Sequence, residues 1–449
     1  MARSFLTDPL SCTQRLGTGD IANAFDAAWA PDSTHVAVSR IVTIPNPRMV
    51  TGTEEEQRLS ILDIATGTSR ELGEGTKAEW SGSGTYLSFW RAGDWDLRVV
   101  SGLGLAALIP STQPSVRWVG DTLYFFHEDE IRAWKGGLSW TVAHVVPDLT
   151  PEYPHDDVYF SADGQKFTMT RYYQSGDVER YLGTTATGSM DAIGDGNTLF
   201  MQWSPVGHTL LLRSASAVSI RADDGAIRNI AASALPGPVH TWTADGTLLF
   251  GKMSATTSAQ IDPFVSVDDQ STVAQLPNLL GVRAFSPDGR FFVGTSRTGL
   301  YSTELDIYRC GAAEDLARAD TSARAGNARL DTDPRRFVRP VSGAITQYVQ
   351  GSHTGIDVSA PFGAIIVAAD DGVIDAVGLV PVGGRRVCVL HKDGLESCDY
   401  HTSLPLVSIG DHVVRGQPVA LIGMTGQTTA PHVHWEAKLN GMIVDPLKE

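Results

Sequence analysis

Long apolar runs and an excess of positive charge are both missing from this 449-residue sequence, and cysteine is scarce. No apolar run approaches the roughly 20 residues that a membrane-spanning helix needs, which excludes such a helix. The four cysteines are few, even in number and compatible with either redox compartment. Lys and Arg total 35 against 51 Asp and Glu, a net charge of −16. Such a surface repels phosphate backbones, so we expect no nucleic-acid partner.

Several catalytic motifs are also missing. The sequence contains no His-Glu-x-x-His, no Gly-x-Ser-x-Gly and no P-loop phrase, so serine-hydrolase and NTPase chemistry are not supported. The first ten residues lack the apolar core of 7–15 residues that defines a signal peptide. We therefore expect either a leader that is absent from this numbering or a different export route.

A short phrase recurs seven times in the first 310 residues. Each copy has an aromatic residue, a small or polar segment with a turn signal, and then an apolar strand pattern. The copies begin at Trp29, Trp80, Trp118, Phe160, Trp203, Trp242 and Phe285. Their spacing runs from 38 to 51 residues with a mean near 43, which matches the roughly 40–45 residues of one β-propeller blade. We expect each aromatic residue to pack between neighbouring blades.

The repeats resemble the TolB-like branch of propeller repeats more than the WD type. This resemblance covers about residues 20–310 and implies a binding platform rather than a chemistry. We therefore predict an all-β chain that begins with a seven-bladed β-propeller, residues 1–310. Residues 311–333 are poor in large apolar residues and indicate an exposed linker. Residues 334–449 contain dense strand signals between Gly-rich turns, which predicts an antiparallel β domain.

Histidines gather in three places in this C-terminal region. His353 and Asp357 are four residues apart, so they share a face of a helical turn or a strand. His432 and His434 project from the same face if they lie in a strand. His353, Asp357 and one of the paired histidines would supply two nitrogens and one carboxylate oxygen. That is the ligand set of a catalytic zinc site with an open fourth position. His401 lies between the other two clusters in sequence.

These motifs, with their flanking residues, resemble the lysostaphin/LytM-type peptidoglycan endopeptidases. The matching phrases occur in order: Phe337-Val-Arg-Pro, His353-Thr-Gly-Ile-Asp357, Tyr400-His401, Gly423-Met-Thr-Gly426, Pro431-His-Val-His434 and Asp445-Pro446. The resemblance covers about a quarter of the chain. It implies that His353, Asp357 and His434 bind one Zn²⁺ per chain and that His401 and His432 assist the chemistry. The sequence departs from the family pattern at Asp399 and Thr402, which affects how His401 is held but removes no ligand.

The resemblance implies a zinc metalloendopeptidase that cleaves peptide stems or cross-bridges of bacterial peptidoglycan outside the cytoplasm, in the periplasm or as a secreted protein. In this hypothesis His432 accepts the proton of the attacking water, and His401 donates a hydrogen bond to the oxyanion. The propeller would target or regulate the enzyme and could bind a protein partner. Two alternatives stay open: a non-catalytic zinc-containing adaptor, and an exported effector or phage-type lysin with the same chemistry.

Two cysteine pairings are predicted. Cys12 precedes the first repeat and Cys310 follows the last, so ring closure would bring them together. Cys388 and Cys398 flank a turn at Asp393-Gly394. A three-residue loop from Lys392 to Gly394 places these two cysteines directly opposite each other, whereas a two-residue loop displaces them and disfavours a bridge.

Overall fold

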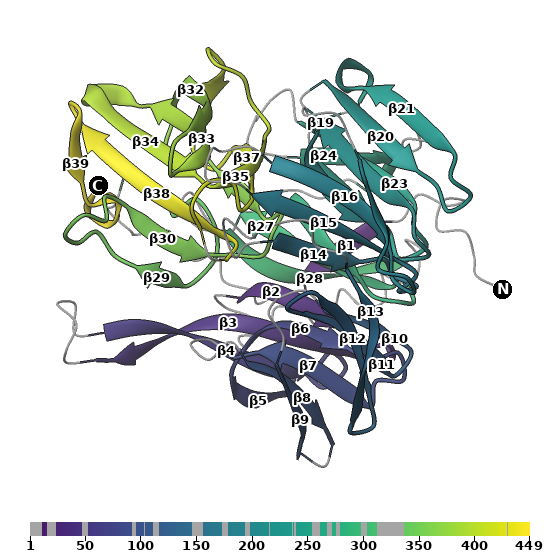
Figure 1. Cartoon of the computed structure of the whole chain (residues 1–449). Coiled ribbons are helices and arrows are strands. Elements are labelled where there is room, and N and C mark those ends of the chain that lie inside the picture. The colour runs from purple at the N-terminus through teal and green to yellow at the C-terminus, as the bar shows by residue number, and fades with distance from the viewer. Residues whose placement is uncertain are drawn as a thin grey trace. The chain divides into compact units, whose positions relative to one another are not determined.

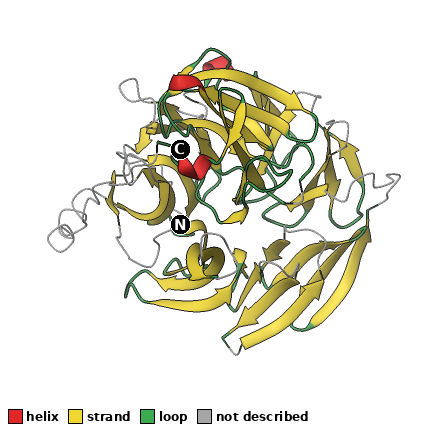
Figure 2. Cartoon of the chain, turned by 90° about the vertical axis from the view of Figure 1, so that its left-hand side faces the viewer, coloured by secondary structure: helices red, strands yellow, loops and turns green. Residues whose placement is uncertain are grey.

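Antiparallel β-sheets are the dominant structure of the described residues in the computed structural model of the chain (Figure 1). The structure describes residues 11–15, 24–46, 53–91, 96–102, 104–110, 116–145, 156–172, 178–193, 198–214, 216–235, 237, 239–253, 261–266, 272–274, 279–297, 303–311, 336–428 and 430–449. The predicted linker lies outside these residues except for Gly311. Helices within the described ranges are three single 3₁₀ turns (Figure 2): η2 (Ala232–Ala234), η3 (Lys392–Gly394) and η4 (Pro446–Lys448).

Seven separate four-stranded antiparallel sheets form from the described strands that precede residue 312. The first three comprise β2 (Ala24–Trp29), β3 (His35–Pro45), β4 (Thr53–Asp63) and β5 (Ser69–Glu74); β6 (Thr76–Trp80), β7 (Tyr86–Trp90), β8 (Asp96–Ser101) and β9 (Gly104–Pro110); and β10 (Val116–Val119), β11 (Thr122–His127), β12 (Glu130–Lys135) and β13 (Leu138–His144). The next two comprise β14 (Asp156–Phe160), β15 (Lys166–Tyr172), β16 (Val178–Thr184) and β17 (Met190–Ala192); and β18 (Thr198–Trp203), β19 (Leu210–Ser214), β20 (Ala217–Arg221) and β21 (Ile227–Ala231).

The last two sheets differ in where their strands come from. One comprises β22 (Val239–Trp242), β23 (Leu248–Met253), β24 (Ile261–Ser266) and β25 (Thr272–Ala274). The other comprises β26 (Leu279–Phe285), β27 (Phe291–Arg297) and β28 (Thr303–Gly311), with β1 (Ser11–Arg15) paired to β28. The first described strand thus completes the sheet formed by the last repeat. Whether the seven sheets close into a ring stays a prediction.

Each recurrent aromatic residue lies at or near the end of the first strand of its sheet, and the turn signal follows it. In the copy at Phe160, the Gly164 N–H donates to the Ser161 carbonyl (2.9 Å), and Asp163 accepts from the Gln165 N–H (3.0 Å). Gly164 has φ 67°, a left-handed conformation that glycine adopts without steric cost. The repeated phrase is therefore the turn between the first two strands of a sheet.

Three of the recurrent tryptophans bind the preceding sheet through their indole N–H. Trp80 donates to the Ala28 carbonyl (3.1 Å), Trp118 to Ser88 Oγ (2.9 Å) and Trp203 to the Tyr159 carbonyl (2.9 Å). Trp118 is also buried and stacks with Tyr86 at 5.8 Å between ring centroids. These contacts confirm, for the three residues, that the aromatic positions pack one sheet against the sheet before it.

The C-terminal region contains two further antiparallel sheets. The larger has the strand order β29 (Ile345–Gln347), β30 (Ile356–Ser359), β38 (His432–Leu439), β34 (Leu395–Tyr400), β33 (Gly384–Leu390), β32 (Gly372–Val380) and β36 (His412–Val413), with β39 (Met442–Val444) paired to β38. The smaller contains β31 (Ile365–Val367), β37 (Pro418–Ile422) and β35 (Thr402–Pro405). The core includes Ile356, Val358, Ile366, Val419 and Val433. The antiparallel β-structure predicted for this region is confirmed.

By its internal contacts the chain divides into two compact units, one of Asp26–Ser39 with Gln57–Ala234 and the other of the remaining residues. The predicted domain boundaries stay a prediction. Among the described residues, no helix has the length and apolar character needed to span a membrane.

One of the two predicted disulfides is present. Cys388 and Cys398 are directly paired between β33 and β34, with their Cα atoms 4.1 Å apart, and they form a bond. The three-residue loop that this pairing requires is η3. Cys12 and Cys310 are opposite each other in the pairing of β1 with β28, but their side chains lie outside the described part of the structure.

Removing the Cys388–Cys398 bond should loosen the hairpin formed by β33 and β34. For a sequence separation of 10 residues, the loop-entropy model gives a loss of about 2–3 kcal/mol. Amide hydrogen exchange in β33 and β34 should accelerate in the reduced wild type and, equally, in the Cys388→Ala/Cys398→Ala variant. Equal protection in oxidised and reduced protein would show that the bond adds nothing to the stability of this hairpin.

Candidate metal centre and active site

The pairing of β30 with β38 brings two of the predicted ligands together. Asp357 is directly opposite His434 in this pairing, and Ser359 is opposite His432. Ile356 and Val358 alternate with Asp357 and are fully buried, so the carboxylate faces the other side of the sheet. Glycine is needed at position 355, because a Cβ there would lie 2.7 Å from His434 Nε2.

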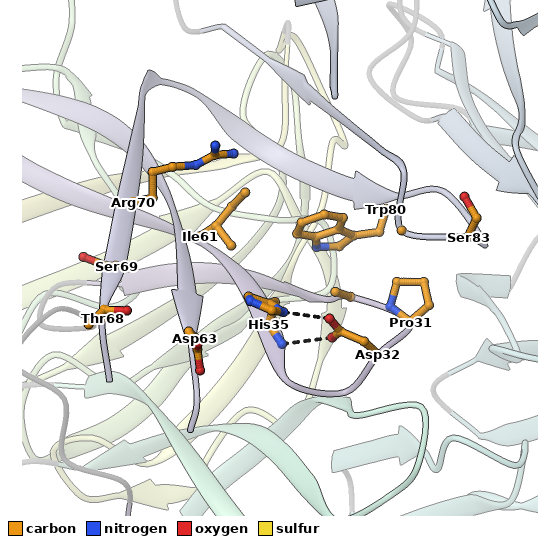
Figure 3. Close-up of a pocket in the computed structure, with 12 residues that line it drawn as sticks. Pro31, Asp32, His35, Ile61, Asp63, Thr68, Ser69, Arg70, Trp80 and Ser83 are labelled. Carbon is orange, nitrogen blue, oxygen red and sulfur yellow. Dashed lines mark hydrogen bonds and ion pairs between the residues drawn. The ribbon is translucent and has the colours of Figure 1, made fainter. Parts of the chain in front are cut away.

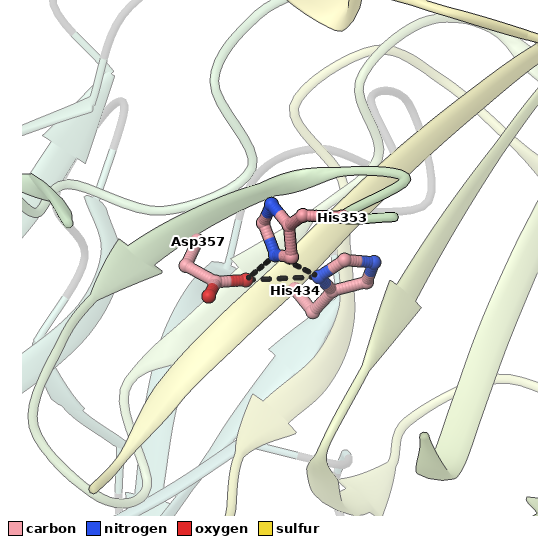
Figure 4. Close-up of side chains that lie close together, drawn as sticks. All are labelled: His353, Asp357 and His434. Atoms are coloured by element: carbon pink, nitrogen blue, oxygen red, sulfur yellow. Dashed lines mark hydrogen bonds and ion pairs between the residues drawn. The ribbon is translucent and has the colours of Figure 1, made fainter. Parts of the chain in front are cut away.

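His353, Asp357 and His434 form one cluster (Figure 4). Asp357 Oδ1 lies 3.1 Å from His353 Nε2 and 2.9 Å from His434 Nδ1, and the two ring nitrogens are 3.1 Å apart. Ligands of a tetrahedral zinc ion with bonds near 2.0–2.1 Å are separated by about 3.3 Å. The three atoms are therefore close to the spacing that one metal ion requires.

Hydrogen bonds on the far side of each ring fix which nitrogen faces the cluster. His353 Nδ1 donates to the Tyr348 carbonyl at 3.0 Å, which leaves Nε2 as the free lone pair. In His434 the order is reversed, with Nε2 lying 3.5 Å from Thr354 Oγ1 and Nδ1 facing Asp357. Partners of this kind orient metal-binding histidines. The donor set thus fits a zinc ion, held by His353 Nε2, Asp357 Oδ1 and His434 Nδ1.

The charge balance of the cluster keeps Asp357 ionised. Burial alone would raise the pKa of this carboxyl group. The hydrogen bond with His434 and the charges of His432, His434 and His353 outweigh burial and lower the Asp357 pKa below its ordinary value. A carboxylate that is already deprotonated can bind a cation without first losing a proton.

The other two predicted histidines adjoin this cluster. His432 Nε2 lies 3.7 Å from Asp357 Oδ1, and the His401 and His432 ring centroids are 4.7 Å apart. His432 Nδ1 donates to the Ala430 carbonyl (2.8 Å), and His401 Nδ1 donates to the Thr425 carbonyl (2.8 Å). Both rings, when neutral, therefore carry a lone pair on Nε2 and can accept a proton there.

Burial disfavours the protonated form of both rings. Desolvation lowers the pKa of His432, and it lowers that of His401 to about 4 with a smaller contribution from the charge of His432. His401 follows the end of β34 and has φ 61°, a left-handed conformation that histidine adopts more readily than β-branched residues do. All five residues predicted from the sequence thus lie at one site.

Several residues at the site were not predicted. The carbonyls of Tyr348 and Thr425 orient two histidines but have no side-chain signature in the sequence. Tyr400 packs edge-on against His434 with ring centroids 5.6 Å apart. Glu436, given no role in the sequence analysis, is buried and accepts a hydrogen bond from the Tyr400 hydroxyl at 3.3 Å. The spacing of two between His434 and Glu436 could have indicated a shared face.

Three polar residues flank the site. Solvated side chains are the expectation for His391 and His412 because both adjoin turn signals. This is confirmed for His412, which is exposed, and is wrong for His391. His391 is 5% exposed and bonds to the Asp371 carbonyl and Ser397 Oγ. Asp399, where the family pattern differs, is buried, and burial raises its pKa well above the ordinary value.

A separate cavity of about 490 Å³ lies among β2–β7 and contains none of the predicted site residues (Figure 3). In its lining, His35 Nδ1 lies 2.7 Å from Asp32 Oδ2 of the same turn, and both are near the indole of Trp80. Asp32 also accepts from the backbone N–H groups of Thr34 and His35. The acidic group is therefore engaged in a turn, and the cavity supplies no second catalytic cluster.

Comparison with known proteins bears on this C-terminal site. The model of peptidase family M23 matches residues 351–446, a range that contains all five histidine and aspartate residues. Residues 351–446 form an M23 peptidase domain. The M23 domain is 39% identical over 95 residues to the DD-carboxypeptidase/endopeptidase Mpg of Neisseria meningitidis, covering 21% of this chain and 22% of that protein.

Two further proteins resemble the M23 domain. The peptidoglycan DD-endopeptidase ShyC of Vibrio cholerae is 35% identical over 114 residues, covering 25% of each chain. The catalytic domain of lysostaphin from Staphylococcus simulans is 29% identical, covering 23% of this chain and 85% of that one, with a TM-score of 0.22. The chain spans about a quarter or less of the length of the curated relatives it matches.

The buried neutral His401 predicts a pH dependence of stability in the metal-free protein. Its pKa is about 4 in the folded state, against the ordinary value of 6.5, so the unfolded chain binds more protons between these values. Stability therefore falls as pH drops from 6.5 to 4, by about 3 kcal/mol for this one residue. Denaturant unfolding of chelator-treated protein should show this loss relative to His401→Asn, a variant that tolerates positive φ. If the difference in unfolding free energy between the two proteins stayed constant across this pH range, the lowered pKa of His401 would be contradicted.

Proposed function

We propose that the protein is a zinc-dependent endopeptidase that cleaves peptide cross-links of bacterial peptidoglycan. The observation that carries the proposal is the convergence of five side chains at one site. His353, His432 and His434 surround Asp357 Oδ1, and the His401 ring lies against that of His432. Three of the five have ligand spacing, and two, His401 and His432, are adjacent rings with free acceptor nitrogens. The relatives named DD-endopeptidase support the substrate class.

A zinc ion held by His353, Asp357 and His434 would supply a water molecule with a pKa lowered to about 7. His432 is the residue we assign as general base, because its Nε2 is an acceptor and faces the metal-binding carboxylate. After accepting a proton it can pass the proton to the leaving amine. His401 can donate to the oxyanion only once Nε2 carries a proton. The resting tautomer makes it an acceptor, so its role as donor depends on the ring being protonated during turnover.

The seven sheets before residue 312 form, in this proposal, a seven-bladed propeller that targets or regulates the peptidase. Support comes from three features: the sheets are all four-stranded, tryptophans link each of several sheets to the one before, and β1 completes the sheet of β26–β28. In this proposal the propeller binds a protein partner. The site of action in this proposal is extracytoplasmic, where the substrate lies.

The first experiment tests activity itself. Purified full-length protein, loaded with zinc, should release soluble muropeptides from isolated peptidoglycan, and a chelator should abolish the release. His412→Ala, which changes an exposed histidine outside the site, should retain full activity. Zinc-loaded protein that cleaves no peptidoglycan preparation would favour the adaptor alternative.

The second experiment separates metal binding from proton transfer. Alanine at His353, Asp357 or His434 should remove zinc or weaken its binding severely, and activity should disappear with it. His401→Ala and His432→Ala should keep near-stoichiometric zinc while the rate falls roughly 10²–10⁴-fold, the range expected for loss of an oxyanion donor or a proton-transfer group. Metal analysis together with muropeptide release distinguishes the two classes. Equal zinc loss in all five variants would refute the division.

A further inference from the structure

The face of the M23 sheet that carries His434 continues away from the metal cluster across two more strands. Tyr400 of β34 is directly opposite His434, and on its far side lies Arg386 of β33. The Arg386 guanidinium lies 5.9 Å from the Tyr400 ring centroid, and one of its nitrogens is 3.5 Å from the Tyr400 hydroxyl. His434, Tyr400 and Arg386 therefore form a row that crosses the sheet.

The two cations on this face differ in how they are neutralised. Lys438 Nζ lies 2.6 Å from Glu436 Oε1 and forms an ion pair with it. Arg386 forms no ion pair with any described residue. Burial and the charge of Asp375 raise the pKa of Glu396, and the charge of Arg386 offsets only part of that rise. A partly buried guanidinium whose hydrogen bond among the described residues is to a phenol hydroxyl is available to a carboxylate from outside the chain.

We propose that Arg386 binds a free carboxylate of the peptidoglycan stem peptide and thereby selects the substrate. This inference rests on the proposed function and names the group that the site recognises. Two strand spacings separate Arg386 from His434, about 10 Å. An extended peptide advances about 3.3 Å per residue, so the carboxylate lies two to three residues from the bond that is cleaved. Arginine presents two parallel N–H donors to a carboxylate, which a neutral carboxamide cannot match.

The test uses two synthetic cross-linked stem-peptide dimers that differ only in having free carboxylates or their carboxamides. The wild type should cleave the carboxylate dimer with a kcat/KM about 10- to 100-fold higher than that for the carboxamide. In Arg386→Gln this preference should disappear through a higher KM for the carboxylate dimer, with kcat and zinc content unchanged. Arg386→Lys should restore part of the preference. Lys438→Met, which removes the paired cation on the same face, should retain it.

Two kinetic results would overturn the proposal. One is an equal loss of kcat/KM for both dimers in Arg386→Gln, which would indicate a purely structural role. The other is a wild type without preference. The same dimers titrated calorimetrically into zinc-loaded His432→Ala, with and without Arg386→Gln, give a readout that does not require cleavage. If the wild type cleaves neither dimer, the proposed function fails. In that case, if the carboxylate dimer binds more tightly than the carboxamide dimer and Arg386→Gln removes this difference, the inference is still supported. Equal affinity for the two dimers would overturn it.

Discussion

Along β38, apolar side chains that face the core alternate with polar side chains that face the site. The whole site depends on this alternation. Val433, Trp435 and Ala437 are almost completely buried, so His432, His434 and Glu436 must face the opposite side of the sheet. A slip of one residue would place two imidazoles and a carboxylate in the apolar core and expose a tryptophan, which the hydrophobic effect opposes strongly. The apolar residues between the functional ones therefore fix the register, and the register places His434 opposite both Asp357 and Tyr400.

Backbone carbonyls then set the chemistry of the rings. The carbonyls of Tyr348, Thr425 and Ala430 accept from the Nδ1 atoms of His353, His401 and His432. Each of these rings is thereby held in one tautomer with Nε2 toward the site. A water-filled site with freely rotating rings would have to reorganise at each turnover. Here folding fixes the ring orientations in advance, so no reorganisation energy is needed during the reaction.

Sequence patterns predicted the parts of this structure that arise from spacing. The aromatic repeat located the first strand and first turn of all seven sheets, and the His-x-x-x-Asp and His-x-His spacings located the cluster. Spacing could not show that His391 is buried, because its partners, the Asp371 carbonyl and Ser397, are brought to it only by the pairing of separate strands. The same holds for Arg386 and Tyr400, which are 14 residues apart and meet only in the register of β33 with β34. Side-chain identity is local, whereas strand neighbours depend on the whole fold.

The disulfide connects this register to the reactive site. Cys388 and Cys398 lie two residues from Arg386 and Tyr400 on the same two strands, so all four side chains share one face. The bond is buried directly beside the Tyr400 ring. It fixes the pairing of β33 with β34 close to Arg386 and Tyr400. A slip in this pairing would separate Arg386 from Tyr400 and from the row that continues to His434. Apolar burial fixes the register of β38 from one side, and a covalent bond fixes that of β33 from the other. The row of residues beside the metal cluster is held between these two restraints, which have different physical origins.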